Sequence, residues 1–510
     1  MANNKTKVMI VGLDGATFDI IKPWADKGEL PTFKKLMKNG VWGPLQSTIP
    51  HATVPAWASF ATGCNPGKHG FYDFFKEKKN SYDLTIEMFP SKATKKPMLW
   101  EILSKAGKKV AVINVPGTYP PQKVNGWVVT GMLTPPNTNF TYPKVFQKEL
   151  FEKIGPYNVF FKALSSKNPN ILLKDLKSTL DTRLKALEYL WNEKKPDFLM
   201  MVDNGTDRSE HEFWRFLDTK NPLYDTNETK KYGNPLLEYY KYVDKKLEKI
   251  LDFIDYNTTL FLMSDHGQGS CRYFVNLNIF LINEGLMKIK KNIFSKIKYH
   301  LFKIGFTPKN VYELLRKIGI ERYATDQTNI KRRLSVINKI FFSSQDIDWN
   351  KTKAFASGVT GAITLNIKNR QPRGCLDFKN DYKKLRNEII EKLENLRYNN
   401  EKIVKKAYKR EEIYKGKYLE NAPDIIAVPS SYYEFFGMHG FTFNKTVIPT
   451  FGNSGSHRPY GIFLSYGYNI KKNFIVNDAN ILDISPTILK IFNINSYFDN
   501  DGKILKKIFK

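Results

Sequence analysis

The sequence VMIVGLDG at residues 8–15 is an apolar run that stops at an acidic residue, Asp14. Two later segments have the same form: DFLMMVDNGTD at 197–207 and LFLMSDHG at 260–267. A continuous apolar run is typical of a parallel strand buried on both faces of a sheet. Because open α/β sheets bind ligands just beyond the carboxyl ends of their strands, we expect the three acidic ends to meet in one metal site.

Strand-like and helix-like segments alternate outward from these runs, and this predicts the fold class. We expect an α/β protein with three α/β/α layers, a mostly parallel central sheet and an inserted cap region. Strands are predicted at 7–13, 108–114, 127–132, 197–202 and 258–264, and helices at 143–153, 172–193 and 236–253. Residues 1–275 and 441–510 are assigned to one discontinuous catalytic domain, and 276–440 to a cap with basic helices that selects the substrate.

Bulk composition indicates a globular chain. Its 510 residues are 42% apolar and 25% charged, and no apolar run is long enough to cross a membrane. The first residues, MANNKTK, contain no apolar signal-peptide core. Three cysteines are too few for a disulfide framework or a thiolate metal cluster. We therefore expect a cytoplasmic, reduced protein.

The net charge of +30 is large and uneven. Residues 271–345 contain fifteen Lys/Arg and four Asp/Glu. A lysine-rich surface that aids solubility is the simpler interpretation; a basic module that binds an anionic membrane or nucleic acid is the alternative. An intermediate hypothesis is that basic helices at 288–339 hold an active enzyme at the inner face of a membrane. No specific nucleic-acid partner is predicted.

Thr53 is the candidate nucleophile. It lies in a segment dense in hydroxyl, Gly and Pro residues, STIPHATVPAWASFATGCNPGKHGFYDF at 47–74. A helix is expected to begin near Pro55, which places Thr53 just before a helix N-terminus, where free N–H groups favour an anion such as phosphate. The competing interpretation is a helix-capping threonine. Further along the segment, His69 is assigned to a structural turn.

Candidate metal ligands follow the other two runs. Asp207 and His211 are four residues apart, a spacing that presents two ligands on one helix face, although a solvated face would show the same pair. Asp265 and His266 directly follow an apolar strand, where a surface loop is the competing interpretation. His457 lies in a Gly/Ser-rich loop, GNSGSHRPYG, and alone would indicate little.

Together these candidates give oxygen and nitrogen donors without thiolate, which suits zinc first and manganese as the alternative. One catalytic zinc takes three protein ligands, and this set is larger. Two divalent metal ions are therefore expected, an arrangement suited to in-line phosphoryl displacement. The donors are Asp14, Thr53, Asp207, His211, Asp265, His266 and His457.

The motifs VGLDGATFD, TVPAWASFATGCNPGKHGFYDF, MSDHG and GSHRPYG, with the Asp207/His211 pair, occur in an order that resembles the alkaline phosphatase superfamily. The resemblance is to its type I phosphodiesterase/nucleotide pyrophosphatase family, and it spans almost the whole chain. It implies that one metal is bound by Asp14, Thr53, Asp265 and His266, and the other by Asp207, His211 and His457.

The resemblance also implies a reaction. Thr53 would form a phosphothreonine intermediate that water hydrolyses, in a phosphodiesterase or pyrophosphatase acting on a small phosphate ester or anhydride. Ala56 stands where the family has an asparagine that contacts phosphate. The alternatives are a phosphomutase, phosphotransferase or phosphomonoesterase that uses the same intermediate and, less favoured, a non-catalytic basic binding protein.

Overall fold

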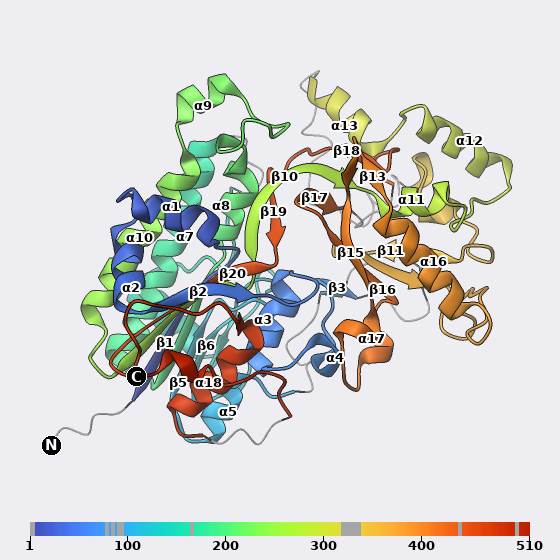
Figure 1. The fold of residues 1–510 in the computed structure, drawn as a ribbon. Coiled ribbons are helices and arrows are strands. Elements are labelled where there is room, and N and C mark those ends of the chain that lie inside the picture. The colour runs from blue at the N-terminus through green and yellow to red at the C-terminus, as the bar shows by residue number, and fades with distance from the viewer. Residues whose placement is uncertain are drawn as a thin grey trace.

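A computed structural model describes residues 6–76, 81–82, 87–88, 96–163, 168–317, 338–436, 441–494 and 499–510. Figure 1 shows two lobes, one built on a large central sheet and the other on smaller sheets. Residues 318–337 of the predicted basic region, and 437–440 of the predicted cap, lie outside the described residues.

The predicted, mostly parallel central sheet is confirmed. Its five parallel strands lie in the order β9 (Thr258–Met263), β1 (Lys7–Leu13), β8 (Phe198–Asp203), β5 (Val110–Ile113) and β6 (Gly126–Val129). Further strands extend both edges: β20 (Tyr460–Tyr466) is antiparallel to β9, β2 (Val41–Gln46) is antiparallel to β20, and β7 (Thr141–Tyr142) is antiparallel to β6. The first strand of the chain therefore lies inside the sheet, between two other acid-terminated strands.

Both faces of the sheet are buried, as the apolar runs predict. In β1, Met9 and Val11 belong to one core while Val8 and Ile10 belong to the other. The first core is covered by α1 (Phe18–Asp26), α2 (Pro31–Asn39), α6 (Phe146–Ile154), α7 (Pro169–Tyr189) and α10 (Pro235–Phe253). The second is covered by α3 (Thr53–Thr62), α5 (Leu99–Lys105) and α18 (Ile484–Ile491), on the opposite side of the sheet in Figure 1. These are the three predicted layers.

The second lobe begins with β10 (Gly267–Val275), which follows β9 in the chain. Along its length β10 pairs with β19 (Gly455–Arg458), β17 (Tyr432–Phe435) and β18 (Val447–Pro449). A further sheet has the order β11 (Ala354–Ser357), β12 (Ala362–Leu365), β16 (Ile425–Pro429) and β15 (Val404–Lys409). Around these sheets lie α11 (Leu277–Asn283), α12 (Ile293–Lys303), α13 (Pro308–Lys317) and α16 (Tyr382–Glu394).

This lobe has an apolar core of its own, to which Phe441 and Val447 also contribute. Among the described residues, no helix combines the length and the apolar character needed to span a membrane.

Candidate active site

The ends of three neighbouring strands bring the acidic residues together. Gly12 is in register with Val202 of β8 on one side and with Met263 of β9 on the other. The chain turns directly after Asp14, because Gly15 has a φ of +74° that favours glycine. The Gly15 amide then donates to Asp265 Oδ1 at 3.2 Å. Asp14 and Asp265 are thus fixed side by side, with both carboxylates buried.

Asp203 also ends a strand, but its contacts are structural. Its Oδ1 accepts from Arg183 Nη1 at 2.8 Å and from the Gly205 amide at 3.1 Å. Its Oδ2 accepts from Tyr239 Oη at 2.8 Å. Both members of the ion pair are buried, with Arg183 only 1% exposed. This carboxylate is satisfied without a metal and ties α7 and α10 to the strand end.

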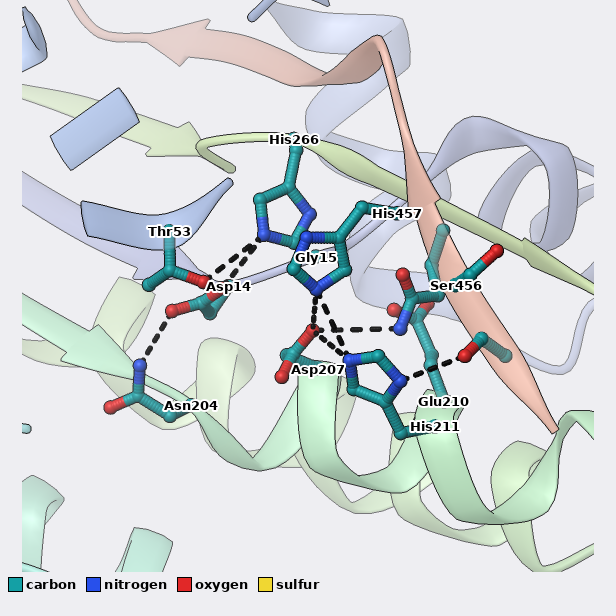
Figure 2. A network of polar contacts seen from close by, with 12 residues as sticks. Asp14, Gly15, Thr53, Asn204, Asp207, Glu210, His211, His266, Ser456 and His457 are labelled. Atoms are coloured by element: carbon teal, nitrogen blue, oxygen red, sulfur yellow. Dashed lines mark hydrogen bonds and ion pairs between the residues drawn. The ribbon is translucent and has the colours of Figure 1, made fainter. Parts of the chain in front are cut away.

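Asp207 and His211 lie on α8 (Gly205–Phe213), where their spacing places both on one face, as Figure 2 shows. Asp207 Oδ1 is 3.3 Å from His211 Nε2 and 3.4 Å from His457 Nε2. His457 was expected in a loop, and that expectation is wrong: it lies in β19, opposite Gln268 of β10. The strand pairing, invisible in a four-residue polar segment, is what directs His457 toward α8.

All three candidate histidines have the tautomer that leaves Nε2 available. Nδ1 of His211 donates to the Gly455 carbonyl at 2.8 Å, and Nδ1 of His266 to the Gly267 carbonyl at 3.1 Å. Nδ1 of His457 donates to the His51 carbonyl at 3.1 Å. Because a carbonyl only accepts, each Nδ1 carries a proton, and the neutral form of each ring has its Nε2 lone pair free for a metal.

The lone pairs converge. Nε2 of His211 is 3.1 Å from Nε2 of His457, a separation that fits a proton on one of the two nitrogens or a cation bound by both, because two lone pairs alone would repel. Nε2 of His266 lies 3.2 Å from Asp265 Oδ2, 3.6 Å from Asp14 Oδ1 and 3.3 Å from Thr53 Oγ1. The two buried oxygens Asp14 Oδ1 and Asp265 Oδ2 have no hydrogen-bond partner among the described residues. Such orphaned carboxylate oxygens fit a cation.

The ionisation of the cluster points the same way. Burial, reinforced by Asp207, raises the pKa of Asp14 to about 7, and burial with Asp14 raises that of Asp265 well above its usual range. Burial also acts to raise the pKa of Asp207, but His211 and His457 hold it well below the ordinary value. Burial acts to lower the pKa of His211, but the nearby Asp207 carboxylate outweighs it and raises the pKa to about 9. The raised pKa values of Asp14, Asp265 and His211 mean that these groups hold protons in the absence of a metal. A divalent ion bound here would replace those protons as the source of positive charge.

The carboxylate and imidazole atoms form two groups, each within 4.8 Å: Asp207, His211 and His457, and Asp14, Asp207 and His266. Asp207 belongs to both, so it lies between the two halves of the cluster. Thr53 and Asp265 join the second group through His266. The oxygen and nitrogen donors fit two divalent ions.

Thr53 is the first residue of α3, which begins two residues earlier than the sequence predicts. Ala52 is at the N-cap and makes no side-chain capping bond, so the helix-capping interpretation of Thr53 is wrong. Pro55 is tolerated in the first turn because the first amides of a helix have no internal partner. The hydroxyl of Thr53 instead faces His266 in the buried cluster (Figure 2).

Several residues that sequence reasoning did not select support the candidate ligands. Asn204 donates to Asp14 Oδ2 at 2.5 Å, and Trp57 of α3 donates to the same oxygen at 3.3 Å. Gln268 Nε2 is 3.5 Å from Asp207 Oδ1. Asn204 directly follows a strand-ending Asp, a signal that was available; the other two depend on tertiary packing.

His69 has the structural role that the sequence predicts. Its Nδ1 accepts from the Phe71 amide at 3.2 Å, so its Nε2 donates to Ser59 Oγ at 2.8 Å. The ring is buried at the end of α4 (Pro66–His69) and closes the segment that follows α3.

A family model, "Type I phosphodiesterase / nucleotide pyrophosphatase", matches residues 8–456, which include all seven candidate site residues except His457. The chain belongs to this family. The family is part of the alkaline phosphatase superfamily, as the fold confirms. No curated protein sequence matches the chain.

Solved structures share the family fold. Murine ectonucleotide pyrophosphatase/phosphodiesterase 5 is 15% identical with a TM-score of 0.52, over 99% of this chain and 100% of that one. The same values hold for an inactive threonine-to-alanine variant of the murine protein in complex with AMP. Phosphonoacetate hydrolase from Sinorhizobium meliloti 1021, in complex with phosphonoacetate, is 14% identical with a TM-score of 0.52 over 94% of each chain. At such identities the likeness establishes the fold alone.

Proposed function

We propose that the protein is a metal-dependent phosphohydrolase that cleaves small phosphate esters or anhydrides through a phosphothreonine intermediate on Thr53. The observation that carries the proposal is the position of Thr53 Oγ1, 3.3 Å from His266 Nε2 at the start of a helix. The hydroxyl is buried in a cluster of three carboxylates and three imidazoles that fit two divalent ions. Zinc is the first candidate and manganese the second.

The chain's own groups have distinct tasks in this reaction. Thr53 Oγ1 attacks phosphorus in line and forms the new P–O bond, while the bond to the leaving oxygen breaks on the opposite side. Bound divalent ions would lower the pKa of the hydroxyl and neutralise charge on the phosphoryl oxygens. The amides of Thr53 and Val54, in the first turn of α3, face the phosphoryl group and donate to its oxygens. Water then hydrolyses the phosphothreonine and restores the free hydroxyl.

We assign the ligands as the family resemblance implies: Asp14, Thr53, Asp265 and His266 to one ion, and Asp207, His211 and His457 to the other. The contacts of His266 with three members of the first set, and of Asp207 with both members of the second, support this division. The position of Asp207 in both groups of donor atoms would hold two ions close together, as in-line displacement requires.

The test compares hydrolysis of bis-aryl and mono-aryl phosphates by wild type and Thr53→Ala, with zinc and manganese added separately. Thr62→Ala is the matched control, because Thr62 is on the same helix and its hydroxyl donates to the Ala58 carbonyl and accepts from the Cys64 amide, away from the cluster. We expect Thr53→Ala to lose activity by several orders of magnitude and Thr62→Ala to keep it. A phosphorylated Thr53 peptide trapped by acid quench would establish the intermediate; full activity of Thr53→Ala would refute it.

A phosphotransferase or phosphomutase would share the same intermediate. The buried position of Thr53 favours neither water nor an alcohol as the second acceptor. Addition of an alcohol to the assay separates them: a transferase forms the new phosphate ester in preference to free phosphate, and a hydrolase does not.

We further propose that residues 276–440 act as the substrate-selecting cap on a catalytic domain of residues 1–275 and 441–510. The separate apolar core of the second lobe supports a two-part chain, and that core also includes Val275, Phe441 and Val447 from outside 276–440. A cytoplasmic location is also proposed, supported by the free thiols of Cys64, Cys271 and Cys375.

A further inference from the structure

Helix α12 lies at the outer end of the second lobe (Figure 1). Several of its large apolar side chains are exposed to solvent. Of the twenty strongly exposed large apolar side chains among the described residues, nine fall between Ile293 and Ile340. Single exposed apolar residues are ordinary, but a dense group of them marks an interaction site. We define the α12 surface by its six most contiguous members, Ile293, Phe294, Ile297, Leu301, Ile304 and Phe306.

The apolar side chains of α12 form one stripe. At about 100° per residue, the five from Ile293 to Ile304 fall within an arc of about 100°. The most exposed are Phe294 at 76% and Ile304 at 70%. Lys296, His300 and Lys303 are exposed along one border of the stripe. This is the pattern of a helix that lies flat in a membrane interface, with apolar residues below and cationic residues at the level of the headgroups.

The opposite face of α12 fixes the helix to the protein. Ser295 Oγ donates to Asp346 Oδ1 at 2.8 Å, and Lys298 Nζ is 3.4 Å from the other oxygen of Asp346. Phe302 is buried, with its ring centroid 5.2 Å from that of Phe342. One face of α12 is therefore packed against the protein, and the opposite face is exposed to solvent. The exposed stripe is a fixed surface of the folded lobe.

Charge selects the occupant. From residue 288 to residue 317 the chain has nine Lys/Arg and one acidic residue, Glu313. Nucleic acid would use these cations but has no use for six large apolar side chains, whereas an anionic bilayer uses both. A second copy of this chain would bring the same positive charge against itself. Charge and apolar area together fit only the bilayer.

We propose that the α12 surface docks the protein onto membranes that contain anionic phospholipid, with the apolar stripe inserted at the headgroup boundary and the lysines on the phosphates. The proposal stands apart from the reaction assigned to Thr53. Docking through α12 would hold the enzyme at the bilayer by the outer end of its second lobe.

The experiment is co-sedimentation of the full chain with phosphatidylcholine vesicles, with and without phosphatidylserine. We expect binding only to vesicles with phosphatidylserine, and its loss at high salt. Phe294→Asp is expected to weaken binding by about tenfold or more, because insertion of a large apolar side chain is lost. Lys303→Ala is expected to weaken it by about fivefold.

Matched controls carry the same changes elsewhere. Val145→Asp replaces an apolar side chain that is 79% exposed on the first lobe, and Lys472→Ala removes an exposed lysine outside the patch. Both should bind vesicles like wild type. The proposal is overturned if wild type ignores anionic vesicles at low salt, or if Phe294→Asp binds as tightly as Val145→Asp. A dimer that Phe294→Asp dissociates, without vesicle binding by wild type, would also overturn it by making a second copy the occupant.

Discussion

Two carboxylates four residues apart, Asp203 and Asp207, are expected to respond differently to the same substitution. Asp203 pairs with Arg183 in the core, where the two side chains are 0% and 1% exposed. Asp203→Asn keeps the shape but leaves the guanidinium buried without an anion. Breaking a buried pair in this way costs about 3–5 kcal/mol. Asp207→Asn instead removes a candidate ligand whose contacts are His211 and His457.

The magnitude can be refined from the remaining contacts. Arg183→Met leaves the Asp203 carboxylate with two donors, Tyr239 Oη at 2.8 Å and the Gly205 amide at 3.1 Å. Arg183→Met should therefore lower the free energy of unfolding by less than Asp203→Asn, which leaves the buried guanidinium without a counter-ion. The Arg183/Asp203 double variant should be more stable than the sum of the two single losses predicts. Each single substitution leaves one buried charge without its counter-ion, and the double variant leaves neither.

Urea unfolding followed by tryptophan fluorescence measures the stability, and metal analysis of the native protein measures bound zinc. With an m value of about 3–4 kcal/mol/M, Asp203→Asn should lower the midpoint by about 1 M while native protein keeps its full zinc content. Asp207→Asn should lose bound zinc with a smaller change in midpoint. The assignment is refuted if Asp203→Asn loses zinc at wild-type stability, or if Asp207→Asn retains all of it.

Two further outcomes follow from the structure. Burial lowers the pKa of His69 to about 3, so as the pH falls below 6.5 the unfolded chain is protonated at this residue while the folded chain is not. The free energy of unfolding should therefore be about 2 kcal/mol lower at pH 5 than above pH 6.5. His69→Gln should reduce this pH dependence, measured as urea midpoints. Gly15→Ala should lower the free energy of unfolding by about 1–2 kcal/mol, because Gly15 has a φ of +74° and an added methyl group would meet residues of α8. The same substitution should lower the affinity for zinc, measured by calorimetric titration.

The central sheet was predictable because its strands are buried on both faces and read as uninterrupted apolar runs. β8 and β9, with every residue buried, were placed to within one residue. β10 escaped prediction because GQGSCRYFV has neither an apolar run nor strict alternation. Its side chains are buried by the second lobe and by β19, which are contacts between segments far apart in the sequence. Tertiary context, absent from local pattern, decides such strands.

The candidate ligands were predictable as residue types at strand ends, but their orientation was not. The tautomer of His211 depends on the Gly455 carbonyl, 244 residues away, and that of His457 on the carbonyl of His51. Asp203 and Asp207 are the same residue type, and only their partners distinguish them: Arg183 and Tyr239 for Asp203, two histidines for Asp207. The partner of a polar group decides its role, and partners come from the fold.

The contacts of the segment around Thr53 show that this candidate nucleophile is not positioned by its own helix alone. The His51 carbonyl, two residues before Thr53, accepts from His457, a candidate ligand. The Ile49 carbonyl accepts from Tyr414 of the second lobe at 2.8 Å. Beyond the helix, Asp73 accepts from the Thr360 hydroxyl of that lobe at 2.7 Å. The segment is therefore tied to the second lobe at Ile49 and Asp73 and to β19 at His51, so the position of Thr53 depends on contacts with segments far away in the sequence.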